Sequence, residues 1–191
     1  MLDRIAKLDT EILIYLNNLG TEFWDPFWLI FTEKYTHIPF VVILLVLVYK
    51  ILGLKQFILS FLFIILMAIT TDQLTNLAKH GFLRPRPCRV PELEGVIRFI
   101  AKRCSPYGFF SGHSCNTMAV AVFIGSILKR KYKYAFPALI IWALAMGYSR
   151  IYVGVHYPAD LLTGFTVGAL VSHLFFYLFS KTSIKLNLNN D

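Results

Sequence analysis

Apolar runs alternate with short polar stretches along most of this chain, a pattern typical of a polytopic membrane protein. Several of the runs are shorter than the roughly 20 apolar residues that cross a bilayer. We therefore expect their polar ends to line a water-filled cavity rather than to face lipid. The five predicted spans are residues 39–52, 57–79, 113–128, 134–148 and 161–179.

The N-terminal segment has apolar residues at helical spacing, but charged residues interrupt it, so it does not read as a signal peptide. The pattern fits a helix in the membrane interface, and it fits equally a helix packed on the protein's own spans. We assign residues 1–35 to N-terminal amphipathic or interfacial helices, residues 36–180 to a transmembrane domain and residues 181–191 to a polar tail.

The composition supports an all-α integral membrane bundle. Hydrophobic residues make up 57% of the 191 positions and charged residues only 16%, whereas soluble domains are about 25% charged. The formal net charge of +8 could indicate a nucleic-acid partner. However, the basic residues lie in loops between apolar runs and form no helical stripe, which favours membrane topology and an anionic ligand over nucleic acid.

Three polar strings follow the second and the fourth predicted spans. An even number of spans separates these positions, so the strings emerge on the same membrane face and can assemble into one site. Because charged residues are costly in lipid, their presence here indicates a function. The strings are Lys79–Pro87, Phe110–His113 and Ser149–Asp160.

His156 and Asp160 lie four residues apart at the start of the last predicted span. A carboxylate bonded to one ring nitrogen fixes the histidine tautomer and leaves the other nitrogen available for attack. Taken alone, the pair is explained equally well as a capping pair at a helix start. Arg150, six residues before the histidine, favours the functional interpretation.

His113 follows Ser111-Gly112 at the start of the third predicted span, where the first N–H groups of a helix can bind an anion. Its imidazole could protonate a leaving oxygen as a general acid, although a Ser-Gly-His tripeptide alone is usually a simple helix start. Basic side chains at span ends could bind a phosphoryl group or anchor lipid head groups. The three candidates for phosphoryl binding are Lys79, Arg86 and Arg150.

Together, these strings resemble the motifs of the type 2 phosphatidic acid phosphatase superfamily over roughly residues 40–180. The motifs are Lys79 with Arg86-Pro87, then Ser111-Gly112-His113, then Ser149-Arg150 with His156 and Asp160. Their spacing selects Arg86 over the otherwise ambiguous Arg84. Phe110 stands where the family usually has proline, so we expect an altered loop shape and altered specificity rather than lost catalysis.

The resemblance implies a helical membrane phosphatase that needs no metal and no cofactor, which agrees with the lack of carboxylate or histidine clusters at metal-ligand spacing. It implies that His156 attacks phosphorus to form a phosphohistidine, that Asp160 orients His156, and that His113 acts as general acid and base. The phosphoryl oxygens would be held by Lys79, Arg86, Ser111, Gly112 and Arg150.

The substrate implied is a lipid phosphate or diphosphate. We favour undecaprenyl diphosphate because the chain is short, and phosphatidylglycerophosphate, phosphatidic acid and lipid A phosphate remain alternatives. Two other classes also fit, an anion transporter and a catalytically silent lipid-binding protein. The expected partners are the substrate lipid and the bilayer, with no protein partner.

A basic cluster at residues 129–133 indicates a cytoplasmic loop, which leaves the site facing outward from a bacterial-type inner membrane, although a count of all basic residues gives the reverse. On the outer face, Cys88 and Cys104 can form a disulfide; on the cytoplasmic face they would be thiols.

Asp72, inside the second span, is expected to make a hydrogen bond that steadies the site. Gly164 and Gly168 favour close helix packing within the monomer.

Overall fold

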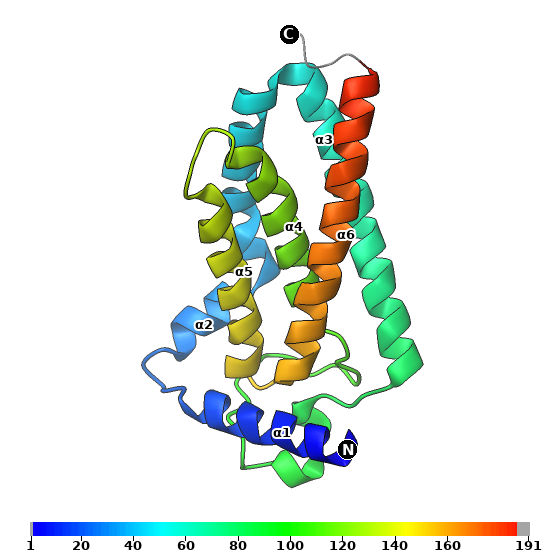
Figure 1. The fold of residues 1–191 in the computed structure, drawn as a ribbon. Coiled ribbons are helices and arrows are strands. Elements are labelled where there is room, and N and C mark those ends of the chain that lie inside the picture. Colours follow the sequence, from blue (N-terminus) through cyan, green and yellow to red (C-terminus); the bar gives the residue numbers. More distant parts are fainter. Residues whose placement is uncertain (1, 187–191) are drawn as a thin grey trace.

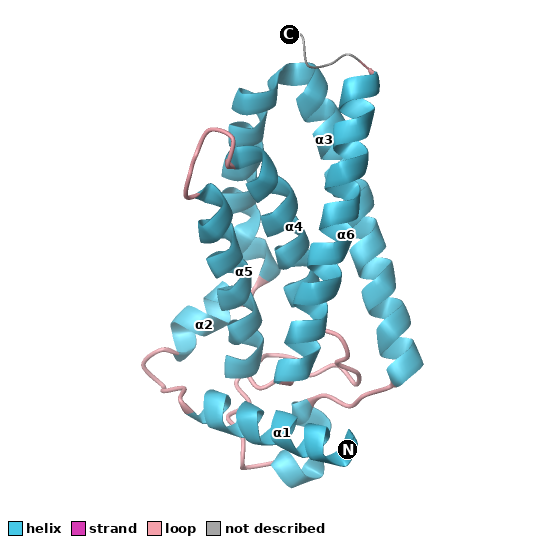
Figure 2. Ribbon diagram, viewed as in Figure 1, coloured by secondary structure: helices cyan, strands magenta, loops and turns pink. Residues whose placement is uncertain are grey.

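The computed structural model describes residues 2–186, and this range folds entirely as helices and loops, without a strand (Figure 2), which confirms the predicted all-α class. Three short 3-10 helices lie before and after the third helix, at Lys34–His37, Pro87–Arg89 and Pro91–Leu93. The α-helices are α1 (Leu2–Asn18), α2 (Asp25–Phe31), α3 (Ile38–Phe82), α4 (Gly112–Leu128), α5 (Ala135–Tyr152) and α6 (Pro158–Lys185).

The long helix α3 reverses direction at Gly53, whose φ of 71° and ψ of 174° lie outside the helical region. Glycine adopts this positive φ without the steric cost that a Cβ would bring. The two arms of α3 run in opposite directions (Figure 1), and the turn separates the two predicted spans at 39–52 and 57–79. In the described chain, α3, α5 and α6 are long and apolar enough to cross a membrane, and α4 is a shorter apolar helix.

Helix α4 is the centre of the bundle and packs on α3, α5 and α6. Two glycines of α6 permit its close approach to α4. A Cβ at Gly164 would lie 2.6 Å from the carbonyl oxygen of Ser111, and one at Gly168 would lie 2.2 Å from that of Cys115. The predicted small-residue packing inside the monomer is therefore confirmed.

Helix α1 lies across one end of the bundle, next to the start of α6 and the end of α5 (Figure 1). Its inner face is buried and consists of Asp9, Leu13 and Asn17, which recur every four residues. Its outer face exposes apolar side chains, so the helix both packs on the protein and offers an apolar surface outward. These exposed side chains are Ile5, Leu8, Ile12 and Tyr15.

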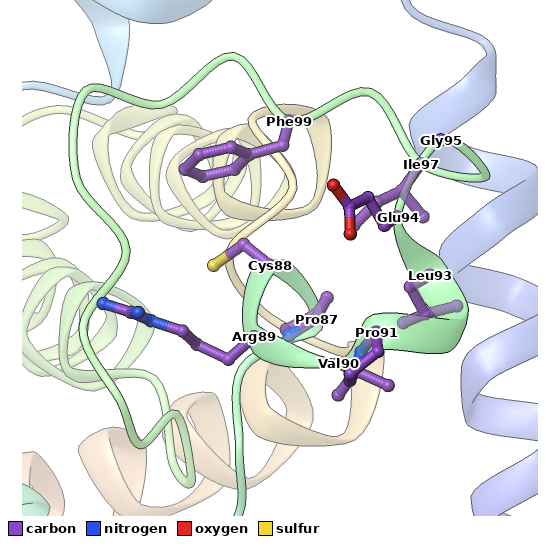
Figure 3. A pocket seen from close by; sticks show the side chains of 10 residues that line it. All are labelled: Pro87, Cys88, Arg89, Val90, Pro91, Leu93, Glu94, Gly95, Ile97 and Phe99. Atoms are coloured by element: carbon purple, nitrogen blue, oxygen red, sulfur yellow. The ribbon is translucent and has the colours of Figure 1, made fainter.

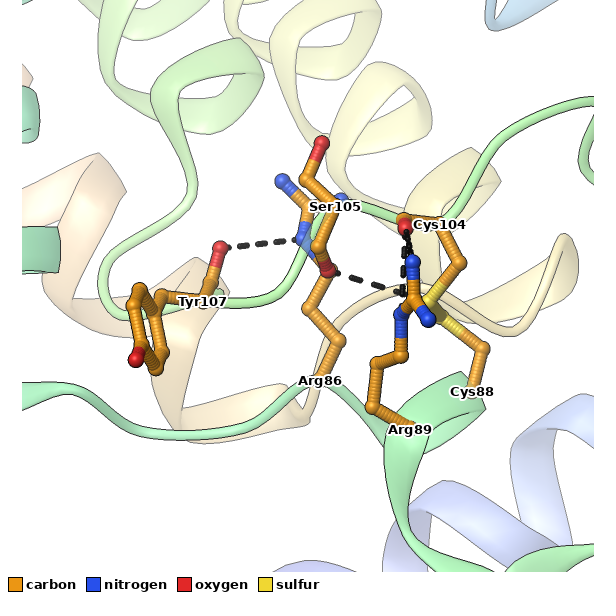
Figure 4. The surroundings of a disulfide bond; sticks show 6 residues. All are labelled: Arg86, Cys88, Arg89, Cys104, Ser105 and Tyr107. Carbon is orange, nitrogen blue, oxygen red and sulfur yellow. Dashed lines mark hydrogen bonds between the residues drawn. A yellow bond between two sulfur atoms is a disulfide. The ribbon is translucent and has the colours of Figure 1, made fainter.

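The loop between α3 and α4 closes the same end of the bundle and carries the disulfide Cys88–Cys104, whose Cα atoms are 6.3 Å apart (Figure 4). Arg89 reinforces this loop by donating a hydrogen bond of 2.7 Å to the carbonyl oxygen of Cys104. At the other end of the molecule, α6 continues to Lys185, so the first residues of the predicted polar tail are helical. Residues 187–191 of that tail lie outside the described range.

Candidate active site

The turn between α5 and α6 holds His156 against Asp160. The Nδ1 atom of His156 lies 3.2 Å from Oδ2 of Asp160, and both side chains are buried. The backbone N–H of Tyr157 donates to the same carboxylate oxygen at 3.1 Å. Because a carboxylate accepts the Nδ1 proton, the Nε2 atom of the ring carries the lone pair.

Burial first, and then the neighbouring cations, hold the pKa of His156 well below the ordinary value of histidine. A neutral imidazole is the nucleophilic form, so the environment favours the species that can attack an electrophile. The cations that act on the ring are Arg86, Arg150, Lys79 and Arg84.

The cations predicted to bind phosphoryl oxygens come from separate elements, α3, the following loop and α5, yet they converge here. His113, in the first turn of α4, interacts electrostatically with all three and with His156. Gly112 lets α3 approach, because a Cβ built on it would lie 3.2 Å from Cγ2 of Thr75 and 3.9 Å from Nζ of Lys79. The structure therefore brings both imidazoles and the predicted cations into one cluster.

Arg86 and Arg150 are each held by a polar partner that leaves part of the guanidinium available. Arg86 is buried and donates from Nε to the carbonyl oxygen of Tyr107 at 3.0 Å (Figure 4). Arg150 donates from Nη1 to the hydroxyl of Thr32, at the end of α2. Its Nε is buried without a hydrogen-bond partner among the described residues, so it is a donor suited to an anionic ligand.

The hydroxyl of Ser111 caps α4 and accepts hydrogen bonds from the backbone N–H of Ser114 at 3.3 Å and from its hydroxyl at 3.0 Å. Its own N–H donates to the carbonyl oxygen of Asp160 at 3.0 Å, which ties the starts of α4 and α6 together.

Asp72 accepts a hydrogen bond of 3.2 Å from Asn116 on α4, as its predicted structural role requires. Phe110, in place of the usual proline, is buried.

Arg84 makes contacts that the sequence did not reveal. Its Nη1 lies 2.7 Å from Oδ1 of Asp160, and its Nη2 lies 2.6 Å from Oδ2 of Asp9. The other oxygen of Asp9 accepts a hydrogen bond of 2.8 Å from the backbone N–H of Ala159. One feature of the sequence could have indicated the contact between Arg84 and Asp9. Asp9 lies four residues before Leu13 and eight before Asn17, which puts its carboxylate on the inner face of α1.

A separate pocket lies on the loop between α3 and α4, beside the disulfide (Figure 3). It is lined by residues between Pro87 and Phe99, with the carboxylate of Glu94 among mostly apolar side chains. Neither imidazole lines this pocket, so it is distinct from the cluster around His156.

Known proteins are similar to this chain in sequence and in fold. The PAP2 superfamily model matches residues 57–184. A lipid A 4′-phosphatase of Bacteroides thetaiotaomicron is 28% identical over 97% of this chain and 83% of its own length. The undecaprenyl-diphosphatase BcrC of Bacillus subtilis is 33% identical over 50% of this chain and 45% of its own length. The crystal structure of a Bacillus subtilis transmembrane PAP2 type phosphatidylglycerolphosphate phosphatase shares the fold, with a TM-score of 0.71 and 22% identity over 95% of this chain and 87% of that one.

Proposed function

This chain belongs to the PAP2 superfamily and is a membrane lipid phosphatase, and we propose that it removes a phosphate group from the head group of lipid A. The similarity to a lipid A 4′-phosphatase extends over nearly the whole chain and supports this substrate. Undecaprenyl diphosphate, which the sequence alone favours, is the second candidate, supported by the similarity to an undecaprenyl-diphosphatase over half of the chain.

In the proposed reaction, Nε2 of His156 attacks phosphorus. A nitrogen–phosphorus bond forms as the bond from phosphorus to the lipid oxygen breaks, and His113 donates a proton to that oxygen. Water then attacks the phosphohistidine, His113 takes its proton, and inorganic phosphate leaves while His156 is restored. The depressed pKa of His156 supports this assignment, because the ring is neutral before the attack.

The charge that develops on the phosphoryl oxygens would be stabilised by Lys79, Arg86 and Arg150. The buried Nε of Arg150 is a suitable donor for one of these oxygens. We assign the Ser111 hydroxyl to positioning, since it caps α4, and the N–H groups at the start of α4, beginning with Gly112, to phosphoryl binding.

We also propose that the site faces outward from the inner membrane. The disulfide of the site loop suits an oxidising compartment, and the basic loop 129–133 lies at the opposite end of the bundle. A green fluorescent protein fused after Asp191 should therefore fold in the cytoplasm and fluoresce. A dark fusion at normal expression would reverse the orientation.

The observation that carries the function is the convergence of two imidazoles and three cations at one end of the bundle. Phosphate release from purified protein tests it with lipid A, undecaprenyl diphosphate, phosphatidylglycerophosphate and phosphatidic acid. We expect the highest kcat/KM with lipid A and a kcat lowered by about 1,000-fold or more in His156→Ala, while His173→Ala, at an exposed position on α6, retains activity. A higher kcat/KM with undecaprenyl diphosphate would favour the second candidate, and absence of turnover would reject a phosphatase.

A further inference from the structure

Helix α1 reaches the reaction centre through a chain of charged contacts that begins at Asp9. Asp9 binds Arg84 at 2.6 Å, Arg84 binds Asp160 at 2.7 Å, and Asp160 holds His156 at 3.2 Å. Asp9 also accepts a hydrogen bond from the backbone N–H of Ala159, in the first turn of α6. The N-terminal helix is therefore connected to both the side chain and the backbone that fix the imidazole.

We propose that Asp9 is a positioning residue of the phosphatase: through Arg84 it orients and tunes Asp160, and thereby sets the basicity of His156. This inference rests on the proposed function and extends it to α1. Asp160 has two carboxylate oxygens, one facing His156 and one facing Arg84. A carboxylate pulled harder by a cation on one side is a weaker acceptor for the imidazole on the other.

The negative charge of Asp9 limits this pull by neutralising Arg84 from the far side. Although burial opposes its charged form, Asp160 and Asp9 raise the pKa of Arg84, so it stays a cation between two anions. The guanidinium also lies over the ring of Tyr157, 4.1 Å from the ring centroid, which restricts its movement. The charged or titratable groups that act on His156 from the surrounding elements are Asp160, Arg84, Arg86, Lys79, Arg150 and His113.

The test is the pH profile of kcat/KM for Asp9→Asn, a variant that keeps the shape and removes the charge. Arg84 then acts more strongly on Asp160, and the imidazolium of His156 becomes less stable. We expect kcat to fall about ten-fold with little change in KM, as for other residues that orient a reacting group. The acid limb of the profile should move to lower pH. Asp9→Glu should restore part of the kcat and part of the original position of the acid limb.

Two control variants distinguish a role of Asp9 in positioning the reacting groups from a role in holding α1 against the bundle. Asn17→Ala also weakens α1, because Asn17 Nδ2 donates to the carbonyl oxygens of Arg98, Ile151 and Tyr152. It should lower the melting temperature and leave the acid limb in place. Glu11→Gln, on the exposed side of α1, should leave both unchanged. An unshifted limb in Asp9→Asn, or an equal shift in Asn17→Ala, would overturn the role of Asp9; an inactive wild type would instead overturn the proposed function.

A second observation, independent of the reaction, concerns the opposite end of the bundle. The sequence has no Asp or Glu in residues 34–71, 95–159 or 161–186, and these ranges supply the described helix ends and loops on that side. Eight cations lie there, and two of them border an apolar groove of about 860 Å³ between the first arm of α3 and α5. The eight are Lys50, Lys55, Lys129, Arg130, Lys131, Lys133, Lys181 and Lys185.

The geometry points to this groove as a site for an anionic phospholipid of the leaflet opposite the active site. Lys131 and Lys133 are exposed and line the groove beside the rings of Tyr132 and Tyr134, a setting suited to a lipid phosphate. Its floor is apolar and reaches Trp142. That residue lies seven positions beyond Ala135, about 10 Å along the helix, within the roughly 15 Å depth of one leaflet.

Trp142 provides a direct reporter, because the chain has only three tryptophans. In Trp24→Phe/Trp28→Phe protein reconstituted in phosphatidylcholine vesicles, brominated phosphatidylglycerol should quench Trp142 at a several-fold lower mole fraction than brominated phosphatidylcholine. Lys131→Gln/Lys133→Gln should abolish this preference.

Lys50→Gln/Lys185→Gln removes two cations of the same face that do not line the groove, and it should retain the preference. Equal quenching by the two lipids, quenching by neither, or a preference that survives Lys131→Gln/Lys133→Gln would overturn the site.

Discussion

Gly108 lies so close to His156 that a Cβ built on it would be 3.5 Å from Nδ1 of the ring. The same Cβ would be 3.2 Å from Oδ2 of Asp160 and 3.1 Å from Cγ of Arg86. The backbone at Gly108 therefore fills the space between the histidine–carboxylate pair and a cation of the site. No side chain fits there without moving one of these groups.

Gly108→Ala should reduce kcat about ten-fold, because the new Cβ displaces Arg86 and Asp160 by a few tenths of an ångström, and Asp160 orients the reacting imidazole. Gly81→Ala is the matched control, since a Cβ at Gly81 meets nothing within 4 Å. Phosphate release at saturating substrate measures the effect. Full activity of Gly108→Ala would mean that the loop backbone does not position His156.

His156→Ala should lower kcat by about 1,000-fold or more with folding intact, because the group that forms the covalent bond is lost. His113→Ala should also lose most activity, since the leaving oxygen then departs without a proton. Asp160→Asn should lose less, because the ring retains part of its orientation. Acid-quenched protein incubated with labelled substrate should yield labelled phosphohistidine in the wild type; near-normal turnover by His156→Ala would exclude the covalent mechanism.

The fold was predictable because its signals are local. Apolar runs gave the helices, and the break near Gly53 separated the arms of α3. Spacing within the motif selected Arg86, which acts electrostatically on both imidazoles, over Arg84, which also acts on His156 but is engaged by Asp160 and Asp9. The chemical roles assigned to the site residues stay predictions.

The contacts of α1 could not be predicted, because they join residues far apart in sequence. Asp9 and Arg84 are 75 positions apart, and their contact depends on how α1 crosses the end of the bundle. In the sequence, the charged Asp9 only interrupts the apolar pattern of the N-terminal segment. Thr32 and Gly108 were likewise missed, because a hydroxyl partner and a close backbone approach have no periodic signature.

Removal of metal should not affect the reaction, since the proposed mechanism uses cationic side chains and a histidine nucleophile. Phosphate release should be the same with and without EDTA, and added Mg²⁺ should not increase it. Vanadate should inhibit, because it resembles the five-coordinate phosphorus between attack and departure. Loss of activity in EDTA that Mg²⁺ or Zn²⁺ restores would contradict the mechanism.

Thr32→Val should weaken substrate binding, because the hydroxyl of Thr32 accepts a hydrogen bond from Arg150. Without it, Arg150 is less well held for the phosphoryl group. We expect KM to rise about five-fold, the equivalent of one hydrogen bond. Thr166→Val, on the exposed face of α6, is the control and should behave as wild type. Equal KM values for the two variants would show that the hydroxyl of Thr32 does not contribute to substrate binding.

Acid should destabilise the wild type through His156. The pKa of His156 is held well below its unfolded value of 6.5, by burial and then by the nearby cations. Between these two values the unfolded chain binds more protons than the folded one, so unfolding is favoured as the pH falls. The stability that the neutral ring contributes is thus present above pH 6.5 and declines below it.

His156→Gln cannot bind this proton and serves as the reference. The difference in melting temperature between wild type and His156→Gln in detergent should therefore shift against the wild type from pH 7 to pH 5. A difference that stays constant over this range would show that the imidazole is protonated in the folded protein as readily as in the unfolded chain. In that case the ring would not be held neutral for attack on phosphorus.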